Sequence, residues 1–416
     1  MISMSFFRNP GRFLSGIAVE LGLAFVLCSY YISGIVGTYL GSNVELLASA
    51  FPLIFGSLVI LGFLASGRVL VDRGGKILML FLFINFFIVF SAIKNFAPEE
   101  SIFFSLRFFY AAIFLGGVAW VIASDKSFSL FHFYLYFCLV VSLLVVYLML
   151  WGESHGSRLS VAGRNPIYFS LLCGLSFSAS FICLISKVKF GFVVRSFLLI
   201  SMIMSFLGLI LSGGRGAVVS VIVTLLFYGI CFSSSYIFSG KVKERVNLRF
   251  LISFLLMSVV GVFYFVESRA VGGVFSLFSG NPGASGSVRI ELFNQWLRAF
   301  GESPFWGVGF SSGLAYPHNI IIELVFRFGV LGGIASMVLV YFVLSYTIIG
   351  FMSRILENRI LAALILCSFT AGLFSFSIVM MSHLFIFIVF AAVFMGAYRF
   401  GFYSGYKTKG LTCFYR

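Results

Sequence analysis

The sequence predicts an all-α, polytopic integral membrane protein with about 12 transmembrane helices. Of its 416 residues, 61% are hydrophobic and only 10% are charged, which leaves too little polar surface to cover a soluble fold. Apolar runs of about 20 residues recur along the chain, and a helix needs about that length to cross about 30 Å of hydrocarbon. The net charge of +15 is then explained by basic cytoplasmic loops rather than by nucleic-acid binding.

The predicted spans follow one another in chain order. They cover residues 16–36, 46–66, 77–93, 102–123, 131–151, 167–187, 196–212, 217–238, 250–267, 318–350, 360–381 and 384–403. The first span is long and lacks a small-residue cleavage site, so we expect a retained helix rather than a signal peptide. The tenth exceeds one span, and its glycines near 329–333 predict a short helix from about His318 to Arg327 followed by a full span.

Basic residues set the predicted orientation. With the N-terminus inside, 19 of the 28 Lys and Arg residues lie in inner segments, so we expect both termini inside. We treat residues 1–416 as a single transmembrane domain in which residues 268–317 form one large outer loop between the ninth and tenth spans. The seven cysteines and four histidines show no metal or redox spacing, so we expect no disulfide, metal or cofactor.

The outer loop contains a short amphipathic segment, residues 287–300. At about 100° per residue its polar and apolar side chains separate onto two faces, which predicts a helix along the membrane interface. Arg298 falls on the polar face, whereas Arg289 falls near the middle of the apolar face, with Phe293 and Trp296. Either Arg289 snorkels to water from a fraying first turn, or it points into a protein cavity as a cation for a ligand.

Three further arginines lie on the predicted outer side. Arg215 occupies a glycine-rich tight turn, residues 210–217, beside a helix N-terminus, and this arrangement suits an anion. The alternative is an ordinary hairpin turn with one charge. Arg158 and Arg164 lie in the medium outer loop 152–166, where they either bind phosphate or sugar or remain solvated.

A histidine begins the predicted short helix of the tenth span. His318 follows Pro317, and an imidazole can act as a general base at neutral pH; the alternative is a capping or buried structural histidine. Asn319 follows it. Glu323 either orients Asn319 or pairs with Arg327 at i+4.

The inner loop 67–77 indicates an alternative of a different class, a 12-helix transporter or flippase. It resembles the loop between the second and third helices of major facilitator transporters. The match is imperfect because Gly67 lies one position too far from Asp72. Those transporters also have a long cytoplasmic link between helices six and seven, whereas residues 188–195 are short.

Three motifs resemble the O-antigen ligase and O-antigen polymerase family. Residues 212–217 (SGGRGA) are similar to its small-residue–Arg–Gly turn. The segment from Arg289 through 304–310 (PFWGVGF) is similar to its arginine helix and glycine turn, and residues 316–333 (YPHNIIIELVFRFGVLGG) to its His–Asn–helix–Gly motif. Gly214 stands where many members have serine, which we expect to matter little because the turn remains small.

The resemblance implies a GT-C-type glycosyltransferase in the bacterial inner (cytoplasmic) membrane, with its active site facing the periplasm. The donor would be an undecaprenyl-diphosphate-linked glycan, used without a metal or a cofactor. Arg215 and Arg289 would stabilise the departing diphosphate, and His318 would take the proton of the acceptor hydroxyl.

The remaining candidates have supporting roles in this interpretation. Asn319 and Glu323 would orient the histidine or the sugar, and Arg158, Arg164 and Arg298 would be further substrate contacts. A polymerase adds the growing chain to the next lipid-linked repeat, whereas a ligase adds it to lipid A-core. The YPHN motif and the modest outer loop favour a polymerase, with an O-antigen ligase as the alternative. The expected partners are the lipid-linked donor, the glycan or lipid A-core acceptor and the bilayer, with a chain-length regulator protein as a further candidate.

Overall fold

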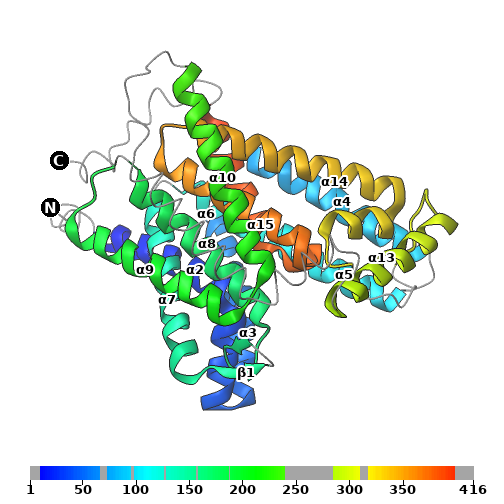
Figure 1. Cartoon of the computed structure of the whole chain (residues 1–416), viewed down its shortest axis with the longest axis horizontal. Helices are drawn as coiled ribbons and strands as arrows, with labels where there is room; N and C mark the ends of the chain where they lie inside the picture. Colours follow the sequence, from blue (N-terminus) through cyan, green and yellow to red (C-terminus); the bar gives the residue numbers. More distant parts are fainter. Residues whose placement is uncertain are drawn as a thin grey trace.

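The computed structural model describes residues 10–65, 73–94, 98–125, 128–155, 158–186, 188–238, 284–309 and 317–398. These segments are mainly helical (Figure 1). The elements are α2 (Pro10–Leu40), α3 (Ser42–Ala65), α4 (Arg73–Lys94), α5 (Pro98–Phe108), the π-helix η1 (Phe109–Phe114), α6 (Leu115–Ala123), α7 (Leu130–Trp151), β1 (Glu153–His155), β2 (Arg158–Ser160), α8 (Pro166–Ile185), α9 (Phe192–Ser212), α10 (Arg215–Phe238), α13 (Ala284–Glu302), α14 (Ile320–Met352), α15 (Leu356–Ser375), the 3-10 helix η2 (Ile378–Met380) and α16 (Ser382–Tyr398).

The helices coincide with the predicted spans. Each predicted span lies mainly on a described helix or helical run, except the ninth, residues 250–267. That span lies outside the described residues, as do residues 66, 187 and 399–403 at the ends of other spans. Eight of the described helices are long and apolar enough to cross a membrane, and α4, α10 and α16 contain shorter apolar helical stretches. The all-α, multi-pass membrane class is therefore confirmed, while the total of about 12 spans and the orientation of the termini remain predictions.

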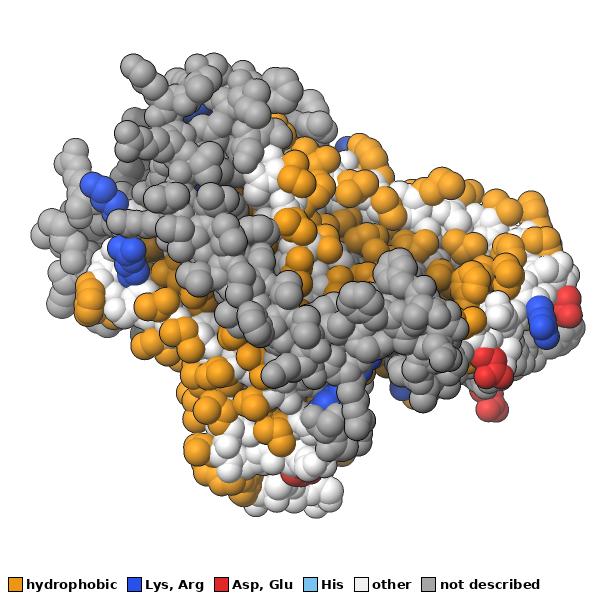
Figure 2. Space-filling model, in the orientation of Figure 1, with side chains coloured by type: hydrophobic (Ala, Val, Ile, Leu, Met, Phe, Trp, Pro, Cys, Tyr) orange, Lys and Arg blue, Asp and Glu red, His pale blue; other side chains and the backbone are white. Residues whose placement is uncertain are grey.

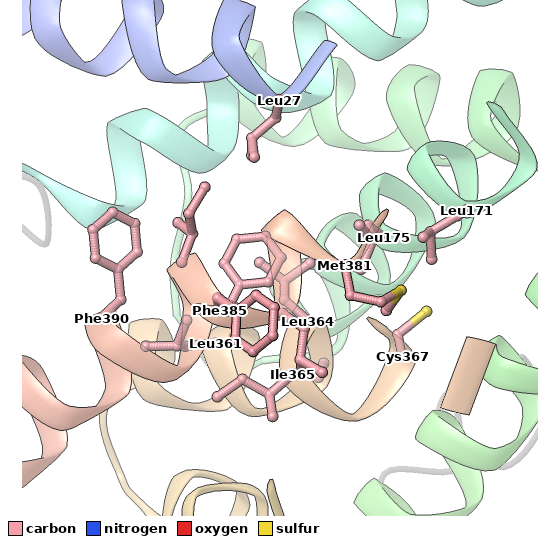
Figure 3. Close-up of a cluster of buried hydrophobic side chains, with 14 of the residues drawn as sticks. Leu27, Leu171, Leu175, Leu361, Leu364, Ile365, Cys367, Met381, Phe385 and Phe390 are labelled. Atoms are coloured by element: carbon pink, nitrogen blue, oxygen red, sulfur yellow. The ribbon is translucent and has the colours of Figure 1, made fainter. Parts of the chain in front are cut away.

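The centre of the molecule is formed by α8 and α15. Both are 83% buried over their most apolar stretch, whereas α3 is 12% buried. Helix α15 packs against α8, α10, α14 and α16, and Figure 1 shows it between α10 and α14. Side chains such as Leu364 on α15 and Phe385 on α16 fill the space between these helices (Figure 3). The central helix thus supplies a rigid base for the chain segments at its ends.

The outer surface of the described helices is apolar. Figure 2 shows hydrophobic side chains over much of the visible face, with charged side chains mostly toward its edges. Leu46, Leu58 and Leu64 on α3 are each more than 60% exposed. A protein in water rarely exposes so much contiguous apolar surface, so these side chains are suited to contact lipid.

A carboxylate on α2 caps the N-terminus of α7. Glu20 on α2 is 2% exposed, and its Oε1 accepts a hydrogen bond from the Ser129 N–H, 2.6 Å away, at the start of α7. His132 Nδ1 lies 3.7 Å from its other oxygen. Glu20 therefore satisfies a donor that the α7 N-terminus leaves unpaired, which explains a charged residue inside the first span.

Candidate functional site

The turn between α9 and α10 is built from glycines that make room for neighbouring side chains. Gly213 ends α9 in the left-handed conformation, with φ of 61°, and a Cβ there would lie 3.1 Å from Cγ of Arg158. A Cβ on Gly214 would lie 1.6 Å from Oγ of Ser170 on α8. The position therefore has no room for a side chain, which accounts for a glycine at 214.

Arg215 is the first residue of α10 and is exposed. The N-terminus of a 24-residue helix carries a partial positive charge, which repels a cation and attracts an anion. The side chain of Arg158, from β2, lies against Gly213 in the same turn. The turn thus places the Arg158 side chain two residues from Arg215 and a helix N-terminus, a combination that suits a doubly charged anion such as a diphosphate.

Arg164 has a different environment from Arg158. Its guanidinium forms an ion pair with Glu45 at the start of α3 and lies over the Tyr30 ring, 5.0 Å from the ring centroid. The two arginines of the medium outer loop, residues 152–166, therefore have different neighbours. Arg158 contacts the glycine turn, whereas Arg164 joins α2, α3 and the loop before α8.

His318 adopts a backbone conformation that is uncommon for its residue type. Its φ is 57°, in the left-handed region, and such conformations in non-glycine residues often occur at functional sites. The next residue, Asn319, caps α14 by accepting hydrogen bonds from the N–H groups of Ile321 and Ile322, each at 3.0 Å. Its Nδ2 donates to the carbonyl of Leu373 on α15, 2.9 Å away. Asn319 thus fixes the backbone that carries His318.

The C-terminal end of α15 brings the turn and the histidine together. Gly216, next to Arg215, packs so closely that a Cβ there would lie 2.6 Å from Oγ of Ser375. Asn319, next to His318, is bonded to Leu373 two residues earlier. Residues separated by about a hundred positions in the chain therefore lie around one helix end, and the candidate site is assembled there.

The predicted break in the tenth span is present in α14. Gly329 has φ of 58° and ψ of −135° and interrupts the helix, as its glycines predict. A helix break leaves backbone groups without their usual partners. Residues 304–309, which we call the clasp, supply them: Val308 N–H donates to Phe326 O (2.9 Å), Gly309 N–H donates to Arg327 O (3.0 Å), and Val330 N–H donates to Phe305 O (3.1 Å).

Glycines make this close pairing possible. A Cβ on Gly307 would lie 2.3 Å from the Arg327 carbonyl oxygen, and one on Gly329 would lie 2.3 Å from the Phe305 carbonyl oxygen. Gly307 and Gly309 also have positive φ, at 76° and 68°. The glycine turn at 304–310 and the glycines of α14 are therefore two halves of one structural unit.

Helix α13 covers the predicted amphipathic segment and docks on α14. Trp296 is fully buried, and its ring stacks on Phe326 at a centroid distance of 6.2 Å. Gln295 and Glu291 are exposed and hydrogen-bond to each other, and Arg298 is also exposed, as expected for the polar face. Arg289 lies in the α13 backbone seven residues before Trp296. Its side chain is outside the described part of the structure, so its predicted cavity remains a prediction.

Glu323 forms the predicted pair with Arg327. Its Oε1 lies 3.3 Å from Arg327 Nε and 3.0 Å from Ser377 Oγ, while Oε2 accepts from Ile378 N–H at 3.0 Å. Glu323 is 1% exposed. It therefore joins α14 to the segment after α15, and any direct contact with a sugar would compete with these bonds.

Arg327 makes more contacts than the pair with Glu323 that the sequence predicts. Its guanidinium also donates to Gly309 O, 3.3 Å away, and lies 4.9 Å from the Trp296 ring centroid. The available signal was a charged residue inside an otherwise apolar run, which usually indicates a function. Among the residues that the structure describes, no group of three His, Cys, Asp or Glu side chains is arranged to hold a metal ion.

The motifs that build this site lie in a part of the chain that matches a known family. Residues 200–337 match the O-antigen ligase family. The match spans α9, the glycine turn, α13, the clasp and the kink of α14, and it confirms the resemblance carried by the three motifs. No curated protein matches the chain.

The O-antigen ligase match supports an enzyme of the ligase or polymerase type, with glycosyltransferase-like activity. Together with the apolar helices it supports a multi-pass bacterial membrane protein. Arg215 and His318 both fall within the matched residues, whereas Arg158 and Arg164 precede them.

Proposed function

We propose that this chain is a metal-independent glycosyltransferase that transfers an undecaprenyl-diphosphate-linked glycan to a sugar hydroxyl on the periplasmic face of the inner membrane. The observation that carries the proposal is the meeting of the Arg158–Arg215 turn and His318 at the end of α15. This arrangement provides cations for a diphosphate and a base for a hydroxyl within one region.

In the proposed reaction, His318 takes the proton of the acceptor hydroxyl as its oxygen attacks the anomeric carbon of the donor sugar. The bond between that carbon and the diphosphate oxygen breaks, and the diphosphate leaves with the bonding electrons. Arg215 and Arg289 stabilise the charge that develops on it. Attack on the side opposite the leaving group inverts the anomeric configuration.

The other candidates hold or extend this arrangement. Asn319 orients His318 by fixing the backbone beside it, and Glu323 orients the same segment through its bonds to Ser377 and Ile378. We assign Arg158 to the diphosphate, because it contacts the Arg215 turn. Arg164 and Arg298 remain proposed contacts for the glycan, away from the reacting bond.

We favour a polymerase, in which the acceptor is the next lipid-linked repeat, because of the YPHN motif and the modest outer loop. The alternative is an O-antigen ligase that uses lipid A-core, and the family match is compatible with both. The lipopolysaccharide of a deletion strain separates them. A single repeat on core indicates a lost polymerase, whereas bare core with accumulated lipid-linked polymer indicates a lost ligase.

A direct assay tests the chemistry. Purified protein is incubated with the lipid-linked donor and each acceptor, and His318→Ala is compared with His318→Asn. Loss of a general base lowers turnover by about 10²–10⁴-fold. Asparagine tolerates the left-handed backbone, so we expect His318→Asn to fold normally and yet to be as inactive as His318→Ala. Normal turnover by the asparagine variant would rule out His318 as the base.

Orientation is tested separately. Reporter fusions at Ser285 and Val246 should place residue 285 in the periplasm and residue 246 in the cytoplasm. Cytoplasmic reporter activity at 285 would rule out a periplasmic active site.

A further inference from the structure

Arg327 joins three parts of the molecule at the kink of α14. It is 8% exposed, and its guanidinium contacts Glu323 on its own helix, the Gly309 carbonyl in the clasp and the Trp296 ring on α13. Its Cζ also lies 5.8 Å from the Phe104 ring centroid on α5. One side chain thus links α13, the clasp and the transmembrane core.

These contacts use the specific shape of a guanidinium. Nε faces the carboxylate, Nη1 faces a carbonyl, and Cζ lies over the indole ring, 4.9 Å from its centroid. A lysine could not make the three contacts together, because an ammonium is a compact charge without a planar fork. The contacts therefore fix direction as well as distance.

A buried ion pair is a poor source of stability, because desolvation offsets most of the attraction. Apolar residues of similar size often stabilise a fold equally well. The aromatic contacts of Phe293, Trp296 and Phe300 with Phe326 already provide apolar packing between α13 and α14. The Glu323–Arg327 pair is thus better explained by the geometry that it imposes than by the energy that it adds.

Two candidate reacting groups lie on the elements that Arg327 joins. Arg289 is on α13, seven residues or about two helical turns before Trp296, and His318 lies just before α14. Glu323, the partner of Arg327, also accepts hydrogen bonds from Ser377 and Ile378, which connects this part of α14 to the segment that follows α15. A shift of α13 relative to α14 would therefore change the separation of Arg289 from His318.

We propose that Arg327 is a positioning residue for glycan transfer. It holds α13 in one register against α14 and so sets the spacing between the diphosphate-binding Arg289 and the base His318. This inference rests on the proposed function, but its structural half can be measured without it.

The first test compares Arg327→Met and Arg327→Lys in the transfer assay. Misplacing a reacting group by about 1 Å lowers rates by about 100-fold, so we expect about that loss of kcat for Arg327→Met and a smaller loss for Arg327→Lys. The KM for the donor should change less than kcat, because the diphosphate still meets Arg215. Glu291→Gln, on the exposed face of α13, is the matched control and should keep normal turnover.

The second test measures the register of α13 directly. Phe293 on α13 and Phe326 on α14 have ring centroids 5.9 Å apart, so a Phe293→Cys, Phe326→Cys pair should be joined by a short bifunctional thiol reagent in membranes. We expect the rate of cross-linking to fall several-fold when Arg327→Met is added to the cysteine pair. An unchanged rate would overturn the proposal.

A rescue experiment separates positioning from direct chemistry. Cross-linking the cysteine pair in the Arg327→Met background should restore much of the lost turnover, and a cleavable linker should abolish that recovery when it is cut. Complete cross-linking with no recovery would show that Arg327 acts on the substrate itself, which overturns the proposal. If the unsubstituted protein transfers no glycan in the same assay, the proposed function fails, while the cross-linking rate still decides whether Arg327 holds α13.

Discussion

Two glycine-rich interruptions of the helices each carry an arginine: the α9–α10 turn and the kink of α14. Their glycines have different neighbours. At the α9–α10 turn, the glycines face side chains: Arg158 lies against Gly213 and Ser170 against Gly214. At the kink of α14, they face backbone: the Arg327 carbonyl meets Gly307 and the Phe305 carbonyl meets Gly329. A second substitution can remove an opposing side chain such as Ser170, whose Cβ would lie 2.4 Å from an added methyl group, but it cannot remove a hydrogen-bonded backbone. The first break is thus adaptable and the second is fixed.

The arginines of the two breaks also differ in their exposure and their contacts. Arg215 is exposed at the surface, and Arg327 is buried and held by Glu323, Gly309 and Trp296. An exposed arginine can exchange water for an incoming anion. A buried, paired arginine instead organises the protein around it. We therefore propose ligand binding at the first break and alignment at the second.

The largest expected effect tests the exposed arginine. Arg215→Ala should lower transfer by about 10²–10³-fold, as is typical when a donor to a developing anion is removed. Thermal stability should remain unchanged because the side chain is exposed. Arg195→Ala, at the other end of α9, is the control and should affect neither activity nor stability. A large loss of thermal stability in Arg215→Ala would show that this arginine is structural, and the two breaks would then be alike.

The next effect tests the rigidity of the kink. Gly329→Ala forces a side chain into a conformation that only glycine adopts readily, against a carbonyl 2.3 Å away, so we expect a loss of about 3 kcal/mol or more of stability. Gly333→Ala is the control in the same helix, since nothing lies within 4 Å of its Cβ position. Thermal unfolding in detergent measures both. Equal melting temperatures would show that the kink is as adaptable as the turn.

A smaller effect is expected at the turn. Gly214→Ala brings a methyl group against Ser170 and should destabilise by about 1–3 kcal/mol through overpacking. Adding Ser170→Gly removes the opposing side chain and should restore much of the melting temperature. Failure of this rescue would mean that the obstacle at Gly214 is the backbone rather than a side chain.

The smallest expected effect concerns α13, which packs beside the fixed break. Arg289→Lys keeps the charge but loses the planar fork that binds two phosphate oxygens, so we expect about a 10-fold loss of transfer at normal expression, equivalent to about 1.4 kcal/mol. Arg298→Lys, on the exposed face, should lose much less. Equal, near-normal activity for both variants would show that Arg289 is a snorkelling surface residue.

Hydropathy was enough to predict most helices, because the apolar runs report directly on the thickness of the bilayer. The kink was also predictable, since Gly329, Gly332 and Gly333 interrupt a run that is too long for one span. The pairing of Glu323 with Arg327 followed from helical spacing. These features are local, and a single stretch of sequence contains the information that determines them.

Contacts between distant segments were not predictable in the same way. Nothing near Arg158 indicates that it rests on Gly213, and nothing near Trp296 indicates Arg327 above its ring. The close approach of Ser170 to Gly214 is a contact of the same kind, since Ser170 lies on another helix. The convergence of the turn and His318 depends on α15, which contains no candidate residue of its own.

The clasp also has a consequence for how the chain is made. Its donors, Val308 and Gly309, precede the carbonyls of Phe326 and Arg327 that they satisfy, just as Glu20 precedes the start of α7 that it caps. A chain is synthesised from its N-terminus, and unpaired peptide groups are costly in hydrocarbon. Each partner therefore leaves the ribosome before the helix that needs it, so both helices can be completed as they enter the bilayer, without waiting for later parts of the chain.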